Sequence, residues 1–180
     1  MDVKVGEKAP EAVFEDHMGK TWRIPDDFRG RRVVLVFLRH LGCPLCLKRI
    51  DELKTDFEKF KELGAQLVVF VQSTWERTKK YAEKKAIPFL LVADREKTVY
   101  SIYGVEKGGI GAFLTPSVFK KSLSATLKGY MHGAFEGDEL QKPAEFVLDE
   151  NGMVIWAHYG KDISDSADND QLMIALRSSL

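Results

Sequence analysis

Short apolar runs alternate along this chain with longer segments in which apolar and polar residues follow a helical period. The runs at residues 33–38 and 66–72 are almost wholly apolar, which is typical of strands buried on both faces in a parallel sheet. Between them, apolar residues recur every three or four positions over residues 43–63. This spacing predicts an amphipathic helix, and Gly64 would end it as a C-cap.

The alternation continues up to a glycine-rich stretch and resumes after it. Residues 105–141 contain six glycines and no clean period, so we expect a loop-rich insertion there. Residues 1–31 predict an irregular lead-in with a hairpin that turns at residues 16–19. Asn151-Gly152 lies between two apolar runs and predicts a second hairpin. The other elements expected are a helix over 74–86, a strand over 89–92, a short helix over 95–103, strands over 144–148 and 153–158, and a final helix over 168–178.

The order of these elements predicts an α/β fold. Strands that alternate with helices pair in parallel through right-handed crossovers. The late hairpin adds antiparallel strands, so we expect a central mixed sheet flanked by helices. This is the layout of a thioredoxin-like fold with an N-terminal extension and a loop-rich insertion before the last hairpin. The chain length suits one such domain over residues 1–180.

Composition narrows the partners that we expect. The 27 basic and 27 acidic residues balance, which argues against a nucleic-acid partner. No apolar run approaches the ~18 residues that cross a bilayer, and residues 1–10 lack the apolar core of a signal peptide. We therefore expect no membrane partner and a cytoplasmic location. Thiols are kept reduced in the cytoplasm, so a close cysteine pair there indicates catalysis or metal binding rather than a structural disulfide.

The chain has two cysteines, Cys43 and Cys46, at the start of the helix predicted over 43–63. Free backbone N–H groups and the positive end of the helix dipole favour a thiolate at the first position, and such placement lowers a cysteine pKa. Cys43 would therefore attack the substrate. Cys46, one turn deeper on the same side, would resolve the adduct by forming an easily exchanged disulfide. This pattern is typical of a thiol oxidoreductase.

Two polar residues immediately precede the cysteine motif. Arg39 would add positive charge near the thiolate or hold an anionic or peroxidic substrate, but a surface arginine at a strand end is the interpretation that the sequence slightly favours. His40 titrates near neutral pH and would serve as an acid or base. A loop histidine that only makes hydrogen bonds is the interpretation we favour for His40.

Zinc binding and inert burial are the two alternatives to redox chemistry at the cysteine pair. A structural zinc site needs four ligands, usually two such pairs or one pair with two spaced histidines. The chain has no second pair, so we expect no metal. Its histidines are scattered at His17, His40, His132 and His158. Inert buried cysteines are disfavoured by the position of the pair between an apolar strand and a long helix.

A proline is also a candidate for the site. Thioredoxin-like domains place a cis-proline just before the strand of the late hairpin, facing the cysteine pair. Pro143 directly precedes the strand predicted over 144–148, so Lys142–Pro143 is the candidate cis bond.

The opening and closing segments, together with the cysteine motif, carry a resemblance to a known family. These segments are residues 6–10 (GEKAP), Gly19, residues 33–37 (VVLVF), residues 39–46 (RHLGCPLC), Gly137-Asp138, Gln141, residues 142–152 (KPAEFVLDENG) and His158. They resemble the alkyl hydroperoxide reductase/thiol-specific antioxidant family, the peroxiredoxins, and its branch with a C-x-x-C motif. The resemblance implies a thioredoxin fold, reduction of peroxides or disulfides, no bound cofactor, and an external thiol reductant such as a thioredoxin.

The resemblance leaves the substrate open. Typical peroxiredoxins carry Thr or Ser three positions and Pro seven positions before the attacking cysteine, where this chain has His40 and Val36. They also hold the peroxide with a late arginine, and this chain has none between Arg95 and Arg177. We favour antioxidant peroxide reduction and keep a thioredoxin-like protein disulfide reductase as the alternative. A redox-sensing binding module, whose insertion over 105–141 recruits a partner, is a third hypothesis, and a homodimer remains open.

Overall fold

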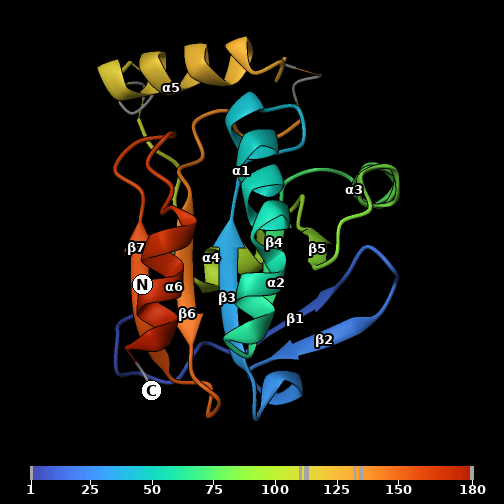
Figure 1. The fold of residues 1–180 in the computed structure, drawn as a ribbon, viewed down its shortest axis with the longest axis vertical. Coiled ribbons are helices and arrows are strands. Elements are labelled where there is room, and N and C mark those ends of the chain that lie inside the picture. The colour runs from blue at the N-terminus through green and yellow to red at the C-terminus, as the bar shows by residue number, and fades with distance from the viewer. Residues whose placement is uncertain (1, 110, 112–113, 132, 134–135, 179–180) are drawn as a thin grey trace.

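A five-stranded mixed sheet forms the centre of the molecule (Figure 1). The computed structural model describes residues 2–109, 111, 114–131, 133 and 136–178. The strands of this sheet are β3 (Arg32–Phe37), β4 (Ala65–Val71), β5 (Leu90–Ala93), β6 (Ala144–Leu148) and β7 (Val154–Tyr159). Their order across the sheet is β5-β4-β3-β6-β7. The β3–β4 and β4–β5 pairings are parallel, whereas β3–β6 and β6–β7 are antiparallel. The predicted mixed α/β sheet of a thioredoxin-like fold is confirmed.

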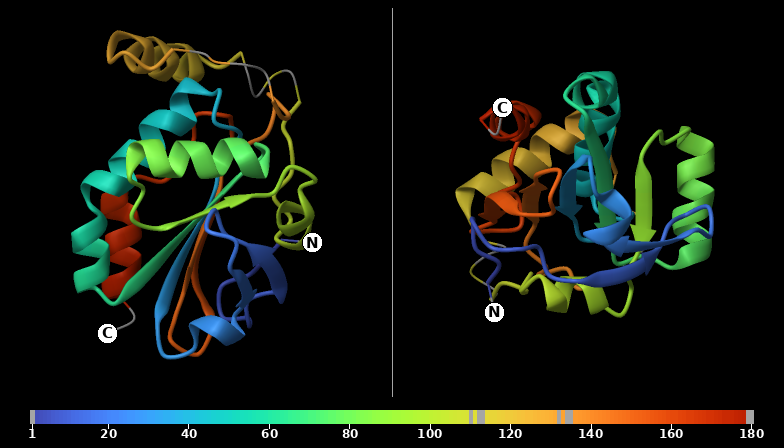
Figure 2. Two further views of the ribbon diagram at one scale, coloured as in Figure 1. Left: turned by 90° about the vertical axis from the view of Figure 1, so that its right-hand side faces the viewer. Right: turned by 90° about the horizontal axis from the view of Figure 1, so that it is seen from below.

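Helices cover one face of this sheet, and a hairpin with a short helix covers the other (Figure 2). The first face carries α1 (Pro44–Thr55), α2 (Phe57–Glu62), α3 (Trp75–Lys85) and α6 (Asn169–Arg177), and the second carries α4 (Thr98–Ile102) and the N-terminal hairpin. In β3, Val34 and Val36 pack toward the first face, whereas Leu35 and Phe37 pack toward the second. Because both faces are covered, the strand is apolar without interruption.

The N-terminal hairpin forms where the turn residues predict it. Strands β1 (Ala12–Glu15) and β2 (Thr21–Ile24) pair antiparallel, and a short 3-10 helix, η1 (Asp26–Phe28), follows them. The carboxylate of Asp16 accepts hydrogen bonds from the backbone N–H groups of Met18 and Lys20. The buried aspartate thereby fixes the turn.

The long helix predicted over residues 43–63 is interrupted at Asp56, which has φ −99° and ψ 12°. Its carboxylate accepts a hydrogen bond from the Asn169 amide at 2.7 Å and pairs with Lys59 at 2.8 Å. Aspartate side chains compete with the helix for such local polar partners. As a result α1 ends here, α2 begins, and α6 is tied to the junction.

The stretch expected to be a loop-rich insertion contains a twelve-residue helix, α5 (Pro116–Leu127), so that part of the prediction is wrong. Thr115 caps the helix by accepting a hydrogen bond from the Val118 N–H, and Pro116 occupies the first turn. The apolar side chains of this helix lie on two separate sides. Val118 and Ala125 are buried, whereas the larger apolar side chains are exposed. The sequence therefore lacks the single apolar stripe by which a helix is recognised. Both views place α5 across the N-terminal end of α1 (Figures 1 and 2).

The predicted cis bond at Lys142–Pro143 is wrong. Among the residues that the structure describes, the one cis peptide bond is Ile24–Pro25. The Pro143 carbonyl accepts a hydrogen bond from the Gly160 N–H at 2.9 Å, which extends the pairing of β6 with β7 by one step. Pro143 lines a cavity that Cys46 also lines.

Candidate active site

Cys43 is the N-cap residue of α1, at the point where the chain leaves β3 and a short loop and enters the helix. Its backbone is extended, with φ −88° and ψ 121°, and its Sγ accepts a hydrogen bond from the Cys46 N–H at 3.4 Å. Pro44 occupies the first turn, where its missing N–H leaves no partner unsatisfied. The sequence therefore placed the cysteine motif correctly at the start of a helix.

The two sulfur atoms differ strongly in acidity. Burial raises the pKa of Cys43, but the Cys46 thiol, the Arg39 charge and the N–H groups of Cys46 and Leu45 outweigh it and lower that pKa to about 6. Burial raises the pKa of Cys46 well above its ordinary value, and the hydrogen bond and negative charge of Cys43 raise it further. At neutral pH this difference favours a Cys43 thiolate beside a protonated Cys46.

Arg39 makes the shortest polar contact to the Cys43 sulfur. Its Nη2 lies 2.7 Å from Cys43 Sγ, and its backbone N–H donates to Cys46 Sγ at 3.3 Å. The side chain is buried, so the alternative of a surface arginine at a strand end does not hold. A charge-assisted hydrogen bond of this kind stabilises the thiolate.

Glu139 holds Arg39 in position, and no pattern in the sequence pointed to it. Arg39 Nη1 donates to the Glu139 carbonyl at 2.7 Å and lies 3.3 Å from Oε2 of the same residue. Glu139 lies in the stretch expected to be an insertion, and its contact with Arg39 joins residues far apart in the chain. A single sequence carries no signal for a contact of that range.

His40 is fully buried and belongs to the same cluster. Its Nδ1 accepts a hydrogen bond from the Gly42 N–H at 3.1 Å, so Nε2 carries the proton and donates to Glu139 Oε1 at 2.7 Å. Burial lowers the pKa of His40 and keeps the ring neutral. This geometry agrees with the hydrogen-bonded loop histidine that the sequence favoured over an acid or base.

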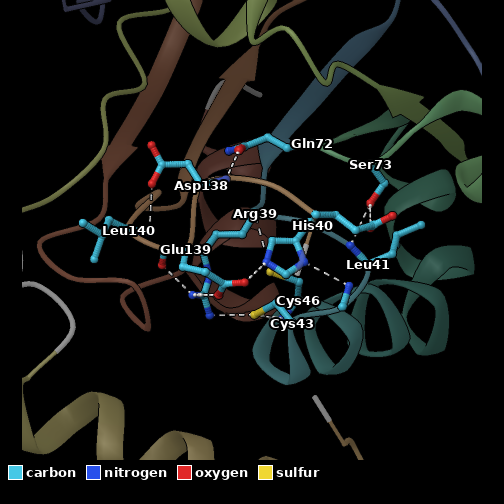
Figure 3. A network of polar contacts seen from close by, with 12 residues as sticks. Arg39, His40, Leu41, Cys43, Cys46, Gln72, Ser73, Asp138, Glu139 and Leu140 are labelled. Atoms are coloured by element: carbon cyan, nitrogen blue, oxygen red, sulfur yellow. Dashed lines mark hydrogen bonds and ion pairs between the residues drawn. The ribbon is translucent and has the colours of Figure 1, made fainter. Parts of the chain in front are cut away.

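Residues 136–139 are tied to the residues that follow β4 (Figure 3). The Asp138 N–H donates to Gln72 Oε1 at 2.9 Å, and Ser73 Oγ donates to Glu136 at 2.7 Å. Gly137 approaches so closely that an added Cβ would lie 2.9 Å from Gln72 Oε1. The backbone of this segment is therefore held against the sheet, and it presents Glu139 to Arg39.

Both cysteines are buried in this structure, with exposed residue fractions of 0% for Cys43 and 5% for Cys46. A cavity of about 360 Å³ is lined by Cys46, Arg39 and Pro143, and a second of about 660 Å³ by Arg39 and Leu45 together with residues of α5. Arg39 lines both cavities and contacts Cys43. Arg39 therefore connects both cavities with Cys43.

A zinc site finds no support among the described residues, because none of them form a group of three or more potential ligands. His17 Nδ1 accepts a hydrogen bond from the Leu91 N–H, and His158 lies against the Asp165 carbonyl. His132 lies outside the described residues. Cys43 and Cys46 are free thiols.

Comparisons with known proteins place the chain in a family context. The model of the AhpC/TSA family matches residues 5–157. Peroxiredoxin Bcp of Bacillus subtilis (strain 168) is 29% identical over 107 residues, which cover 59% of this chain and 68% of that protein. Among solved structures, peroxidoxin BcpB of Mycobacterium tuberculosis superposes with a TM-score of 0.72 at 20% identity, covering 98% of this chain and 97% of that one. A peroxiredoxin-like protein of Aquifex aeolicus gives a TM-score of 0.73 at 18% identity, covering 100% and 90%.

Proposed function

The chain belongs to the AhpC/TSA family and is a thiol-dependent oxidoreductase of the peroxiredoxin kind, and on that premise we propose that it reduces peroxides with Cys43 as attacking and Cys46 as resolving thiol. The contact that carries the proposal is the 2.7 Å hydrogen bond from Arg39 Nη2 to Cys43 Sγ. It supports a thiolate with a pKa of about 6. It also supplies a cation where negative charge develops during peroxide cleavage.

In the first step the Cys43 thiolate attacks the terminal oxygen of the peroxide. An S–O bond forms as the O–O bond breaks, so the sulfur loses two electrons and becomes a sulfenic acid. The leaving oxygen departs as an alkoxide or hydroxide and takes a proton from solvent. The guanidinium of Arg39, held by Glu139, stabilises this negative charge as it forms.

In the second step Cys46 resolves the sulfenic acid. Its sulfur attacks Cys43 Sγ, the S–O bond breaks, and the thiol proton leaves with the hydroxyl group as water. The product is a Cys43–Cys46 disulfide. An external dithiol such as a thioredoxin then donates two electrons and restores both thiols.

The alternative, a protein disulfide reductase, uses the same two sulfur atoms. The burial of Cys43 favours the peroxide, because a sulfur with no exposed surface admits a small molecule more readily than the disulfide of a folded protein. His40 and Val36 depart from the typical motif, but this departure does not favour the disulfide. His40 is buried and donates a hydrogen bond to Glu139, and Glu139 in turn holds Arg39.

Rapid mixing of the reduced protein with hydrogen peroxide tests the proposal. We expect a second-order rate far above that of a free thiol, whereas insulin is reduced slowly. Cys43→Ser should abolish the reaction, and Cys46→Ser should leave a sulfenic acid on Cys43 that a dimedone probe traps. A peroxide rate equal to that of free cysteine, together with rapid insulin reduction, would establish the disulfide reductase instead.

A further inference from the structure

Helix α5 exposes a stripe of large apolar side chains. Phe119, Leu123 and Leu127 lie four positions apart on one side of the helix, with exposed fractions of 74%, 51% and 80%. Leu114 and Met131, at the two ends of the helix, are equally exposed. These five are half of the ten exposed large hydrophobic side chains among the described residues. Clustered exposure of this kind marks an interaction surface rather than scattered apolar residues.

The other side of α5 is fixed to the rest of the molecule. Val118 and Ala125 are buried. Tyr130, just after the helix, donates to the Asp51 carboxylate at 2.8 Å, and Lys121 Nζ donates to the Ser164 carbonyl at 2.8 Å. The helix is thus anchored on one side, while Phe119, Leu123 and Leu127 are exposed, and it lies at one end of the molecule (Figure 1).

The charged residues of the segment that contains α5 have a single sign. Residues 107–135 contain four lysines and neither aspartate nor glutamate, in a chain whose formal net charge is zero. Lys107 forms an ion pair with Asp138, and Lys121 donates the hydrogen bond that anchors α5 to the Ser164 carbonyl. Lys120 and Lys128 make no ion pair within the described part of the chain. Two lysines next to an apolar stripe form a surface that favours an anionic, apolar partner.

A groove lies beside this stripe and extends as far as Arg39. The cavity of about 660 Å³ lies between α5 and the start of α1, with Phe119, Leu114 and Val118 on one side and Leu45 on the other. Arg39, which contacts Cys43 Sγ, also lines it. The apolar surface therefore continues inward to the guanidinium beside the reactive sulfur.

We propose that α5 docks the protein on the surface of an anionic lipid bilayer. An amphipathic helix with leucine and phenylalanine on one side and lysine beside them binds in the plane of such a surface. A second copy of this chain fits less well, because pairing two α5 helices brings lysines of one sign together.

The sequence led us to expect no membrane partner because no apolar run could span a bilayer. No helix among the described residues is long and apolar enough to do so, but docking on a surface needs no spanning helix.

Sedimentation with vesicles tests the docking. We expect the reduced protein to bind vesicles of phosphatidylcholine containing phosphatidylglycerol and not vesicles of phosphatidylcholine alone. Lys120→Ala/Lys128→Ala should weaken binding by about five-fold for each lysine. Leu123→Ser/Leu127→Ser should weaken it by about tenfold or more. Ile174→Ser removes an equally exposed apolar side chain from α6 and should leave binding unchanged.

Three results would overturn the docking proposal: no binding to anionic vesicles, binding that none of the α5 variants weakens, or a dimer in light scattering that Leu123→Ser/Leu127→Ser dissociates while vesicle binding is absent. Circular dichroism checks that each variant folds, and Leu123→Ser alone replaces the double variant if that one does not. The hydrogen peroxide rate of the wild-type protein without vesicles tests the proposed function separately. Vesicle binding without peroxide reduction would leave the docking intact and remove the peroxidase.

Discussion

At the scale of single residues, the site depends on the contacts of the Arg39 guanidinium with two partners, Cys43 and Glu139. One end of its guanidinium contacts Cys43 Sγ, and the other is held by the carbonyl and carboxylate of Glu139. Burial alone would keep Cys43 protonated, because low-dielectric surroundings disfavour a thiolate. The thiolate therefore exists through specific hydrogen bonds and one fixed positive charge.

Removing that charge tests the role of Arg39. Arg39→Ala should raise the pKa of Cys43 and lower the rate with hydrogen peroxide by roughly 10²-fold, because both the thiolate and the leaving oxygen lose a stabilising donor. The pH dependence of thiolate absorbance and the peroxide rate are the measurements. Arg31→Ala removes an exposed arginine and serves as the control. A variant Arg39→Ala with the wild-type pKa and rate would show that the contact is incidental.

Glu145 is a second buried titratable residue, located on β6. Ser166 donates a hydrogen bond to its Oε1, while Arg49 and His158 contribute positive charge nearby. Burial raises its pKa from 4.5 to about 7 in spite of these partners. The protonated form is therefore the one that the folded protein accommodates.

This shift predicts how stability changes with pH. The unfolded chain releases the Glu145 proton near pH 4.5 and the folded chain near pH 7, so the free energy of unfolding should fall by about 3 kcal/mol across that interval. Glu145→Gln should remove this decrease. Urea unfolding of both proteins below pH 4.5 and above pH 7 is the measurement. An equal decrease in the variant would assign the pH dependence to another group.

At the scale of elements, the segment over residues 136–139 brings the clamp on Arg39 to the sheet. It is fixed by Gln72 and Ser73, which follow β4. The glycine at position 137 is required because of the close approach to Gln72. The contacts of Gln72 and Ser73 thus position Glu139, which acts on the Cys43 sulfur only through Arg39.

Gly137→Ala should disturb this segment without touching the reacting atoms. Its Cβ would lie 2.9 Å from Gln72 Oε1 and 3.0 Å from Gln72 Cβ, so either the Gln72 side chain or the segment that it holds must shift. Small misplacements in a catalytic site cost up to roughly 10²-fold in rate, and we expect a loss of roughly tenfold with hydrogen peroxide. Gly109→Ala adds a Cβ in open space and should have no effect. Equal peroxide rates for the two variants would show that the position of residues 136–139 does not affect catalysis.

These elements show what the sequence could and could not predict. The strands, the N-terminal hairpin and the cysteine pair at the start of a helix follow from local patterns, and the structure agrees with them. The helix break at Asp56 depends on a contact with Asn169, and the position of Arg39 depends on a contact with Glu139. Both contacts join residues far apart in the chain. Helix α5 was missed because its buried positions, Val118 and Ala125, are few and its larger apolar residues face outward.

At the scale of the whole molecule, the fold gathers its chemistry at one end. The carboxyl end of β3, the start of α1, the residues after β4 and the segment before β6 meet there, and α5 lies across them (Figures 1 and 3). Such convergence outside the carboxyl ends of strands is where α/β sheets place their sites. Cys43 is buried because these elements meet around it, and no local pattern in the sequence indicated this burial.

The most direct test of the central claim is the rate at which reduced protein reacts with hydrogen peroxide as a function of pH. We expect a rate far above that of free cysteine, which rises with a midpoint at a pH of about 6 and then stays level. A midpoint at the ordinary thiol pKa of ~8.5, or a rate no faster than free cysteine at the same pH, would contradict an activated Cys43 thiolate.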